Sequence, residues 1–163
     1  MLETSPSVAD PSGMPPIERQ TAAVRDPHMV LRELASGFPA GVLVGLTVRS
    51  GAEIEVMAWS SPRAKLAEEA QLISETAPNR LALHEESAVT VADLDTETRW
   101  SECRAQLRLL GLRSLHCRRV AGAKGRIAVL DLYADRSNVL GADLDVAVEA
   151  ACHQIAAMLD GGE

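Results

Sequence analysis

The chain has 163 residues, 47% of them hydrophobic and only 2% aromatic, which is enough for one compact domain with a core of Leu, Val, Ala and Ile. Its 16 Lys and Arg against 23 Asp and Glu give a formal net charge of −7, which argues against a nucleic-acid partner because such binding needs a basic surface. We find no secretion signal and no apolar stretch of bilayer-spanning length, so we expect a cytoplasmic protein without a membrane partner.

Residues 1–16 are rich in Pro and Ser and are expected to form a flexible N-terminal tail. Residues 17–160 are expected to form a single domain. Within it, helical signals interrupted at Pro27 predict an N-terminal helical region over 17–36, and the core of the domain is expected over 38–159.

The core begins with a β-branched run at 41–48 that has no polar face, which predicts a strand covered on both sides. A turn signal at Ser50-Gly51 and a second strand at 53–59 complete a hairpin. Ser61-Pro62 is a helix start, since Ser can cap the helix and Pro fits its first position. In this helix Leu66, Ala70 and Ile73 share one face, and Pro78 ends it or opens another short helix.

The remaining pattern alternates short strands with helices. The elements expected are a strand at 89–91, a helix at 99–110 whose apolar stripe opens with Trp100, strands at 113–120 and 126–133, and a long helix at 143–159. Because hairpins dominate, we expect an α+β fold with a mostly antiparallel sheet and helices packed on it.

The second half of the chain resembles a GAF domain, of the kind found in actinobacterial signalling proteins that pair GAF with an ANTAR RNA-binding module. The resemblance is carried by VADLDTETRW at 91–100, LGLRS at 110–114, AVLDLYA at 128–134 and the helix start at 143–145. It implies a GAF/PAS-like central sheet with helices on both faces, and a sensory function. Such relatives have Gly-Glu-Gly-Pro-Cys where this chain has residues 75–79 (ETAPN), and no ANTAR module is expected here.

Asp131 is the first candidate for a ligand contact. It shares a strand face with Val129 and Tyr133, and a carboxylate among apolar strand residues is costly unless it is paired. It would either anchor a ligand, facing Arg118 on the neighbouring strand, or form an ordinary structural hydrogen bond. In GAF folds the ligand lies between the sheet and the helices that residues 66–110 would supply. The ligand-pocket candidates by this analogy are Trp59, Asn79, His116, Arg118, Asp131 and Tyr133.

The last predicted helix has two apolar stripes. Leu144, Val148, Ala151 and Ile155 lie on the face expected to pack on the sheet. The opposite stripe is small and mostly apolar, and a helix that covers one sheet needs only one such face. We therefore expect a homodimer, with its interface candidates in that second stripe: Val146, Ala150, His153 and Ala157.

The cysteines, Cys103, Cys117 and Cys152, are widely spaced and contain no CxxC pair, so no metal site is indicated and reduced thiols are expected. One GAF branch, free methionine sulfoxide reductase, uses cysteines in loops, whereas these three fall on a helix, a strand and a helix. We therefore expect a non-catalytic sensory or regulatory domain that binds a small molecule or a signalling protein partner. The alternatives are a degenerate GAF scaffold or dimerisation module without a ligand, and a thiol enzyme of the reductase type; the sequence identifies no cofactor.

Overall fold

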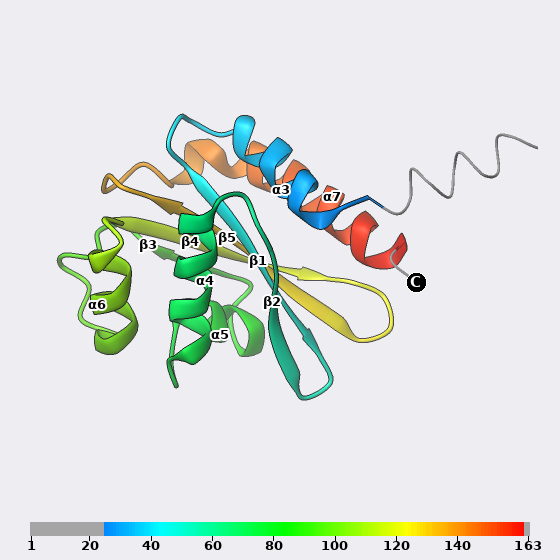
Figure 1. The fold of residues 1–163 in the computed structure, drawn as a ribbon, viewed down its shortest axis with the longest axis horizontal. Coiled ribbons are helices and arrows are strands. Elements are labelled where there is room, and N and C mark those ends of the chain that lie inside the picture. Colours follow the sequence, from blue (N-terminus) through cyan, green and yellow to red (C-terminus); the bar gives the residue numbers. More distant parts are fainter. Residues whose placement is uncertain (1–24, 162–163) are drawn as a thin grey trace, which may run out of the picture.

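The computed structural model describes residues 25–161. They contain a five-stranded antiparallel sheet in the order β2–β1–β5–β4–β3, with helices on both faces (Figure 1). The strands are β1 (Leu43–Ser50), β2 (Glu53–Trp59), β3 (Ala88–Val91), β4 (Ser114–Ala121) and β5 (Arg126–Ala134). The expected α+β architecture and both expected hairpins, β1–β2 and β4–β5, are confirmed.

One face of the sheet is covered by α3 (Pro27–Ser36) and α7 (Asp145–Gly161), which lie side by side in Figure 1. Asp26 caps α3 by accepting a hydrogen bond from the backbone N–H of His28 at 3.0 Å. A short 3-10 turn, η2 (Ala142–Leu144), leads into α7. The buried residues of α7 are Val148, Ala151, Ile155 and Leu159.

The other face is covered by α4 (Pro62–Ile73), α5 (Pro78–His84) and α6 (Ser101–Leu109). Ser61 caps α4 as its sequence predicts, because its hydroxyl accepts a hydrogen bond from the N–H of Ala64 at 3.1 Å. Because both faces are covered, β1 is buried along most of its length, which confirms the interpretation of its apolar run.

The buried face of α4 differs from the predicted one. Leu66 and Ile73 are 51% and 76% exposed, and of the predicted face only Ala70 is buried. The residues that α4 turns inward include Glu68 and Gln71, which are fully buried. The prediction was wrong because it assigned hydrophobic residues to the interior, whereas this interior supplies hydrogen-bond partners to polar ones.

Trp100 also differs from its expected place in a helical core stripe. It precedes α6 with left-handed backbone geometry (φ 53°) and is half-buried. The guanidinium of Arg99 lies over its ring, 4.2 Å from the centroid.

The predicted helical region over 17–36 is described from residue 25 onward, and its earlier part and the predicted tail lie outside the described residues. No helix within 25–161 is long and apolar enough to cross a membrane.

Candidate functional site

A row of facing residues crosses the sheet beneath α4 and α5. Asp131 on β5 pairs with Gly45 on β1 and with Cys117 on β4. Directly paired residues of antiparallel strands point to the same face, so the Asp131 carboxyl and the Cys117 thiol point toward the helices. Asp131 and Cys117 are fully buried.

Gly45 makes room for a glutamate at this point. A Cβ atom at position 45 would overlap the side-chain carbons and a carboxyl oxygen of Glu68. The carboxyl group of Glu68 therefore reaches the sheet directly over β1, where a larger residue would block it.

Hydrogen bonds hold Glu68 against two strands. Its Oε1 accepts a hydrogen bond from the hydroxyl of Thr47 on β1 at 2.7 Å, and its Oε2 accepts a short one from the hydroxyl of Tyr133 on β5. The Tyr133 hydroxyl in turn accepts from Gln71 Nε2 at 2.7 Å. Two neighbouring turns of α4 are thus attached to β5 through one phenol group.

Asn79 extends this set of bonds from α5. Its backbone N–H donates to Gln71 Oε1 at 2.9 Å, and its Nδ2 donates to Asp131 Oδ2 at 3.2 Å. We call the linked side chains the interior polar cluster: Thr47, Glu68, Gln71, Asn79, Asp131 and Tyr133. The cluster joins α4, α5, β1 and β5, and the space between the helices and the sheet is filled by the protein's own groups at this point.

The two carboxyl groups of the cluster are neighbours, because the Glu68 carboxyl lies over Gly45 and Gly45 pairs with Asp131. Burial, and then the charge of Asp131, raise the pKa of Glu68 well above its ordinary value. Burial also raises the pKa of Asp131, to about 6, and the neighbouring side chains of Glu68, Cys117 and Asn79 oppose that rise. Among the residues described, neither carboxyl accepts a hydrogen bond or ion pair from a Lys, Arg or His.

The structure divides the predicted pocket candidates among several places. Asn79, Asp131 and Tyr133 meet in the interior polar cluster. Arg118 pairs with Leu130 and His116 with Leu132, so both point to the opposite face of the sheet. The expectation that Asp131 faces Arg118 is therefore wrong, because the register of β4 and β5 places Cys117 opposite Asp131.

His116 and Arg118 belong to the contact between β4 and α7. His116 Nδ1 lies 2.7 Å from the hydroxyl of Thr90, and its Nε2 lies 3.2 Å from a guanidinium nitrogen of Arg118. Burial, and then the charge of Arg118, lower the pKa of His116 to about 4, so this imidazole is neutral at pH 7. Arg118 also pairs with Asp145 and Glu149 of α7 at 3.5 and 3.1 Å.

Trp59, the remaining candidate, lies at the end of β2 and contacts α3. Its ring meets that of His28 edge to face, with centroids 4.3 Å apart. The ammonium group of Lys65 on α4 lies 5.0 Å from its centroid. Trp59 thus connects helices from the two layers, away from the interior polar cluster.

The three cysteines are shielded from solvent to different degrees. Cys103 and Cys117 are buried and Cys152 is half-buried, and all three are free. Burial raises the pKa of Cys103 to about 12 and that of Cys152 to about 11, and it raises the pKa of Cys117 as well. These thiols are therefore protonated at neutral pH, whereas the thiolate is the reactive form.

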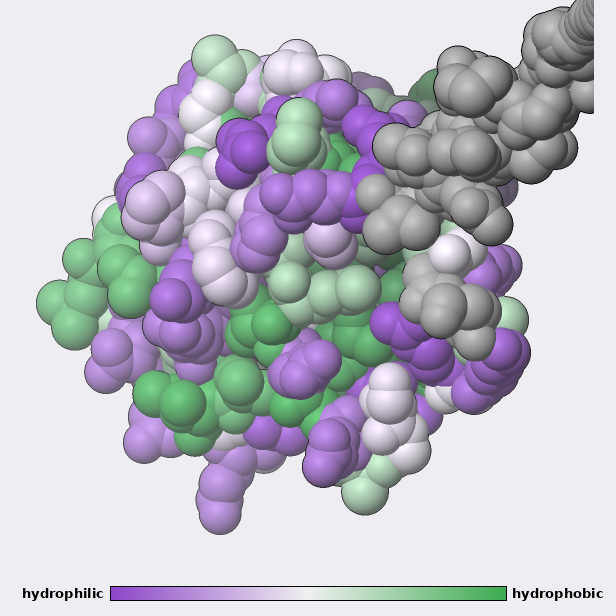
Figure 2. All heavy atoms as spheres, turned by 45° about the vertical axis from the view of Figure 1, so that its right-hand side comes forward, coloured by the Kyte–Doolittle hydropathy of each residue, from purple (hydrophilic) through white to green (hydrophobic). Residues whose placement is uncertain are grey.

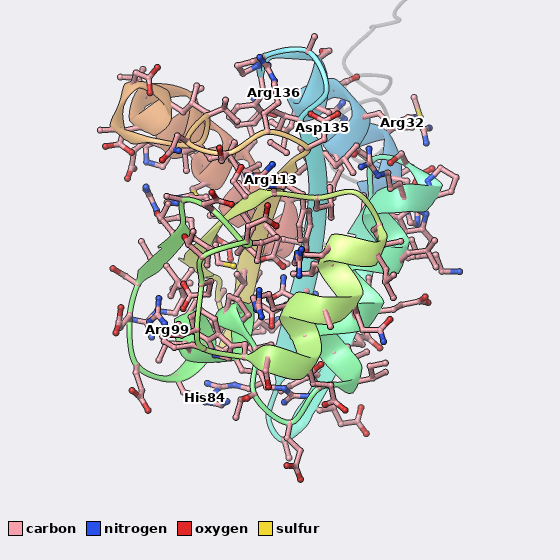
Figure 3. The ribbon with its side chains drawn as sticks, turned by 90° about the vertical axis from the view of Figure 1, so that its left-hand side faces the viewer. Arg32, His84, Arg99, Arg113, Asp135 and Arg136 are labelled. Carbon is pink, nitrogen blue, oxygen red and sulfur yellow. The ribbon has the colours of Figure 1, made fainter. Side chains whose placement is uncertain are left out.

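A surface cleft of about 310 Å³ lies outside the cluster, beside α5. Its lining residues are Glu75, Thr76, Ala77, Arg80, Leu81, His84, Glu85 and Trp100. Figure 3 shows His84 and Arg99, the neighbour of Trp100, toward the same end of the domain. This cleft was not predicted, because no sequence pattern identifies the left-handed backbone of Trp100, which places the indole beside α5.

The dimer-interface candidates all lie on the exposed side of α7. Val146 is 84% exposed, and Ala150, His153 and Ala157 are also exposed. Ala150 borders a groove of about 220 Å³ between α7 and α3, which Phe38 and Leu34 also line. On the side drawn in Figure 2, hydrophobic residues reach the surface between hydrophilic ones.

Comparison with protein-family models gives no match, and no match is found among curated proteins. Solved structures do match over most of the chain. Free methionine-R-sulfoxide reductase of type II from Thermoplasma acidophilum is similar with a TM-score of 0.64 and 12% identity, covering 86% of this chain and 93% of that one. The GAF domain of a two-component sensor histidine kinase from Bacillus halodurans has a TM-score of 0.59 and 10% identity, covering 82% and 92%.

A third similar structure is the phycoerythrobilin-bound GAF domain of a cyanobacterial phytochrome, with a TM-score of 0.59 and 12% identity, covering 90% of this chain and 91% of that one. The chain has a GAF fold. Identities this low establish the fold alone, and the GAF-fold neighbours include both sensory domains and a reductase. The finer resemblance to GAF domains paired with ANTAR stays a prediction.

Proposed function

We propose that this protein is a non-catalytic regulatory GAF domain that acts as a homodimer and transmits its signal through protein contacts. The observation that carries the proposal is the interior polar cluster. In it, Glu68 and Asn79 occupy the space between the helices and the sheet and take up the hydrogen-bonding groups of Tyr133 and Asp131. Because these side chains occupy the interior at this point, the arrangement favours regulation through the protein surface over regulation by a ligand bound in the interior.

The exposed side of α7 is the surface we assign to the dimer. Val146, Ala150, His153 and Ala157 follow one another at spacings of four, three and four residues, which is the spacing of a coiled-coil seam. The two alanines allow a second helix to approach closely, and Val146 supplies apolar area that is 84% exposed in the single chain. A two-fold axis would bring the same stripe of the second copy against this one.

The state of the cysteines supports a non-catalytic role. A thiol enzyme needs an exposed thiolate with a second thiol nearby, and here burial raises the pKa of each of the three thiols. The three buried or half-buried thiols therefore support a non-catalytic role over a thiol enzyme.

Light scattering coupled to size exclusion tests the dimer. We expect wild type to be dimeric at micromolar concentration and Ala150→Glu to be monomeric, because a carboxylate would lie in the centre of the seam. Ala105→Glu is the matched control, since Ala105 is an exposed alanine on α6. The proposal fails if wild type is monomeric, or if Ala150→Glu dimerises as wild type does while its circular dichroism is unchanged.

A small-molecule sensor is the second candidate function, and the cleft beside α5 favours it. Its volume of about 310 Å³ is at the lower end of ligand pockets, which span about 300–1,000 Å³. Trp100 offers an aromatic ring there, so a ligand in the cleft would change its fluorescence. Trp100→Phe would remove that change, whereas Trp59→Phe would retain it.

A further inference from the structure

The interior polar cluster contains two acids and no base. Glu68 on α4 and Asp131 on β5 are both 0% exposed, and the Glu68 carboxyl lies over Gly45, the residue that pairs with Asp131. A buried charge is tolerated when an opposite charge or enough hydrogen bonds compensate it, and two adjacent buried carboxylates would also repel each other. The pair therefore cannot carry two negative charges in the folded protein.

One oxygen of the pair has no fixed donor. Asp131 Oδ2 accepts from Asn79, but the fully buried Oδ1 accepts no hydrogen bond from any group that the structure describes. The groups beside Asp131 that can carry a labile proton are the carboxyl of Glu68 and the thiol of Cys117. A thiol is a weak donor, so a protonated Glu68 satisfies this oxygen best.

We propose that Glu68 and Asp131 form a proton-binding site, and that release of this shared proton to solvent at rising pH loosens α4 and α5 from the sheet. This proton-binding site does not depend on the dimer, so the pH proposal and the dimer proposal can each fail without the other. It uses groups that are already in place and needs no further ligand.

The attachment of the helices explains why the loosening would be local. Glu68 and Gln71 hold α4, and Asn79 holds α5, through the same bonds that surround the carboxyl pair. Repulsion between two carboxylates would push Glu68 away from β5 and draw water into this space. The helices α3 and α7 lie on the other face of the sheet and make none of these bonds.

The other titratable groups around the pair do not supply a compensating positive charge. Tyr133 on β5, Cys117 on β4 and Cys103 on α6 face it, and each of them is neutral at pH 7 with a raised pKa. On the same sheet face, Arg119 lies two positions beyond Cys117, and Arg49 contacts His84 at 3.1 Å. From α5, Arg80 donates to the carbonyls of Leu72 and Ser74.

Infrared spectroscopy of the full chain tests the proton itself. We expect wild type at pH 7 to show the C=O band of a buried protonated carboxylic acid and Glu68→Gln to lack it, whereas Asp131→Asn should keep the band at a shifted frequency because Glu68 stays buried there. Glu69→Gln, one residue along α4 and half-buried, is the control that should keep the band. Absence of the band in wild type at pH 7, or its unchanged persistence in Glu68→Gln, would overturn the assignment.

Hydrogen exchange tests the consequence. Between pH 6 and 9, exchange from α4 and α5 of wild type, divided by that of Glu68→Gln at the same pH, should rise by up to about tenfold per pH unit once the proton leaves. The same ratio for α3 and α7 should stay constant. Asp131→Asn serves as a second reference if Glu68→Gln does not fold. A ratio that stays flat for α4 and α5, or that rises equally in all four helices, would contradict a local switch.

Discussion

Gly45 and Glu68 fit together because position 45 carries no side chain: a Cβ there would occupy the place of the Glu68 carboxyl group. Since Gly45 is also paired with Asp131 across β1 and β5, the missing side chain sets the position of the whole carboxyl pair. One small residue in a central strand thus permits a charged helix residue to reach the sheet.

Gly45→Ala should therefore destabilise the protein, by about 1–3 kcal/mol, as overpacking of a filled interior does. Urea unfolding followed by circular dichroism measures the change. Gly37→Ala is the control, because its Cβ would meet only the carbonyl oxygen of Leu34 at 3.4 Å. Equal stability of Gly45→Ala and wild type would show that Glu68 does not lie against β1.

Tyr133→Phe should cost about 1–3 kcal/mol, because it leaves Gln71 Nε2 and Glu68 Oε2 buried without their shared partner. The ring stays in place, so packing changes little and the loss reports the hydroxyl. Thermal or urea unfolding measures it, and Ser36→Ala, at an exposed hydroxyl that donates only to the carbonyl of Glu33, is a control. A loss no larger than that control would show that the hydroxyl is dispensable.

The fold was predictable from sequence to a greater extent than the site. Turn signals and alternation located every strand of the sheet to within about two residues and placed Asp131 on the face of Val129 and Tyr133. They could not identify its neighbour, because a shift of one residue in β4 exchanges Arg118 for Cys117 opposite Asp131.

The interior polar cluster was missed for a different reason. Glu68 and Gln71 are residue types that normally face solvent, so the helix pattern assigned them to the surface and Leu66 and Ile73 to the core. A signal was present in the small residues Ala64 and Ala67, which share the buried face of α4 with them. The predicted face was chosen by hydrophobicity. The residues on the observed face are buried because they are small or because the interior offers them hydrogen-bond partners.

His116 should remain neutral down to acid pH, since burial and Arg118 lower its pKa to about 4. The unfolded chain binds a proton at this residue near its ordinary pKa, and the folded protein does not. The resulting contribution therefore lowers stability as pH falls from about 6.5 toward 4. Nuclear magnetic resonance of the four histidines checks the titration, and an imidazole of His116 that charges near pH 6.5 would contradict the described burial.

Arg118→Ala should loosen the start of α7, because Arg118 pairs with both Asp145 and Glu149. The two acidic partners are largely exposed, so the loss should be modest, about 0.5–1 kcal/mol. Hydrogen exchange in the first two turns of α7 measures it, with Arg32→Ala on the exposed side of α3 as the control. Unchanged exchange at 145–152 would mean that Arg118 does not hold the helix.

The thiols should resist modification in the folded protein. Cys103 and Cys117 should not react with a maleimide at pH 7.5 within a time that labels all three cysteines of the urea-unfolded chain, and Cys152 should react slowly. The triple Ser variant should keep the oligomeric state of wild type. Rapid labelling of Cys117, the most buried of the three, would contradict its described burial and would support a thiol enzyme.

Native mass spectrometry of the protein purified without denaturation tests the central claim most directly. A regulatory domain whose interior is filled by its own side chains should give a homodimer with the mass of two bare polypeptides. A monomer would contradict the assignment of α7 to an interface. A reproducible mass above that of the polypeptide would contradict the claim that the domain works without a bound small molecule, and would support the ligand-sensor function instead.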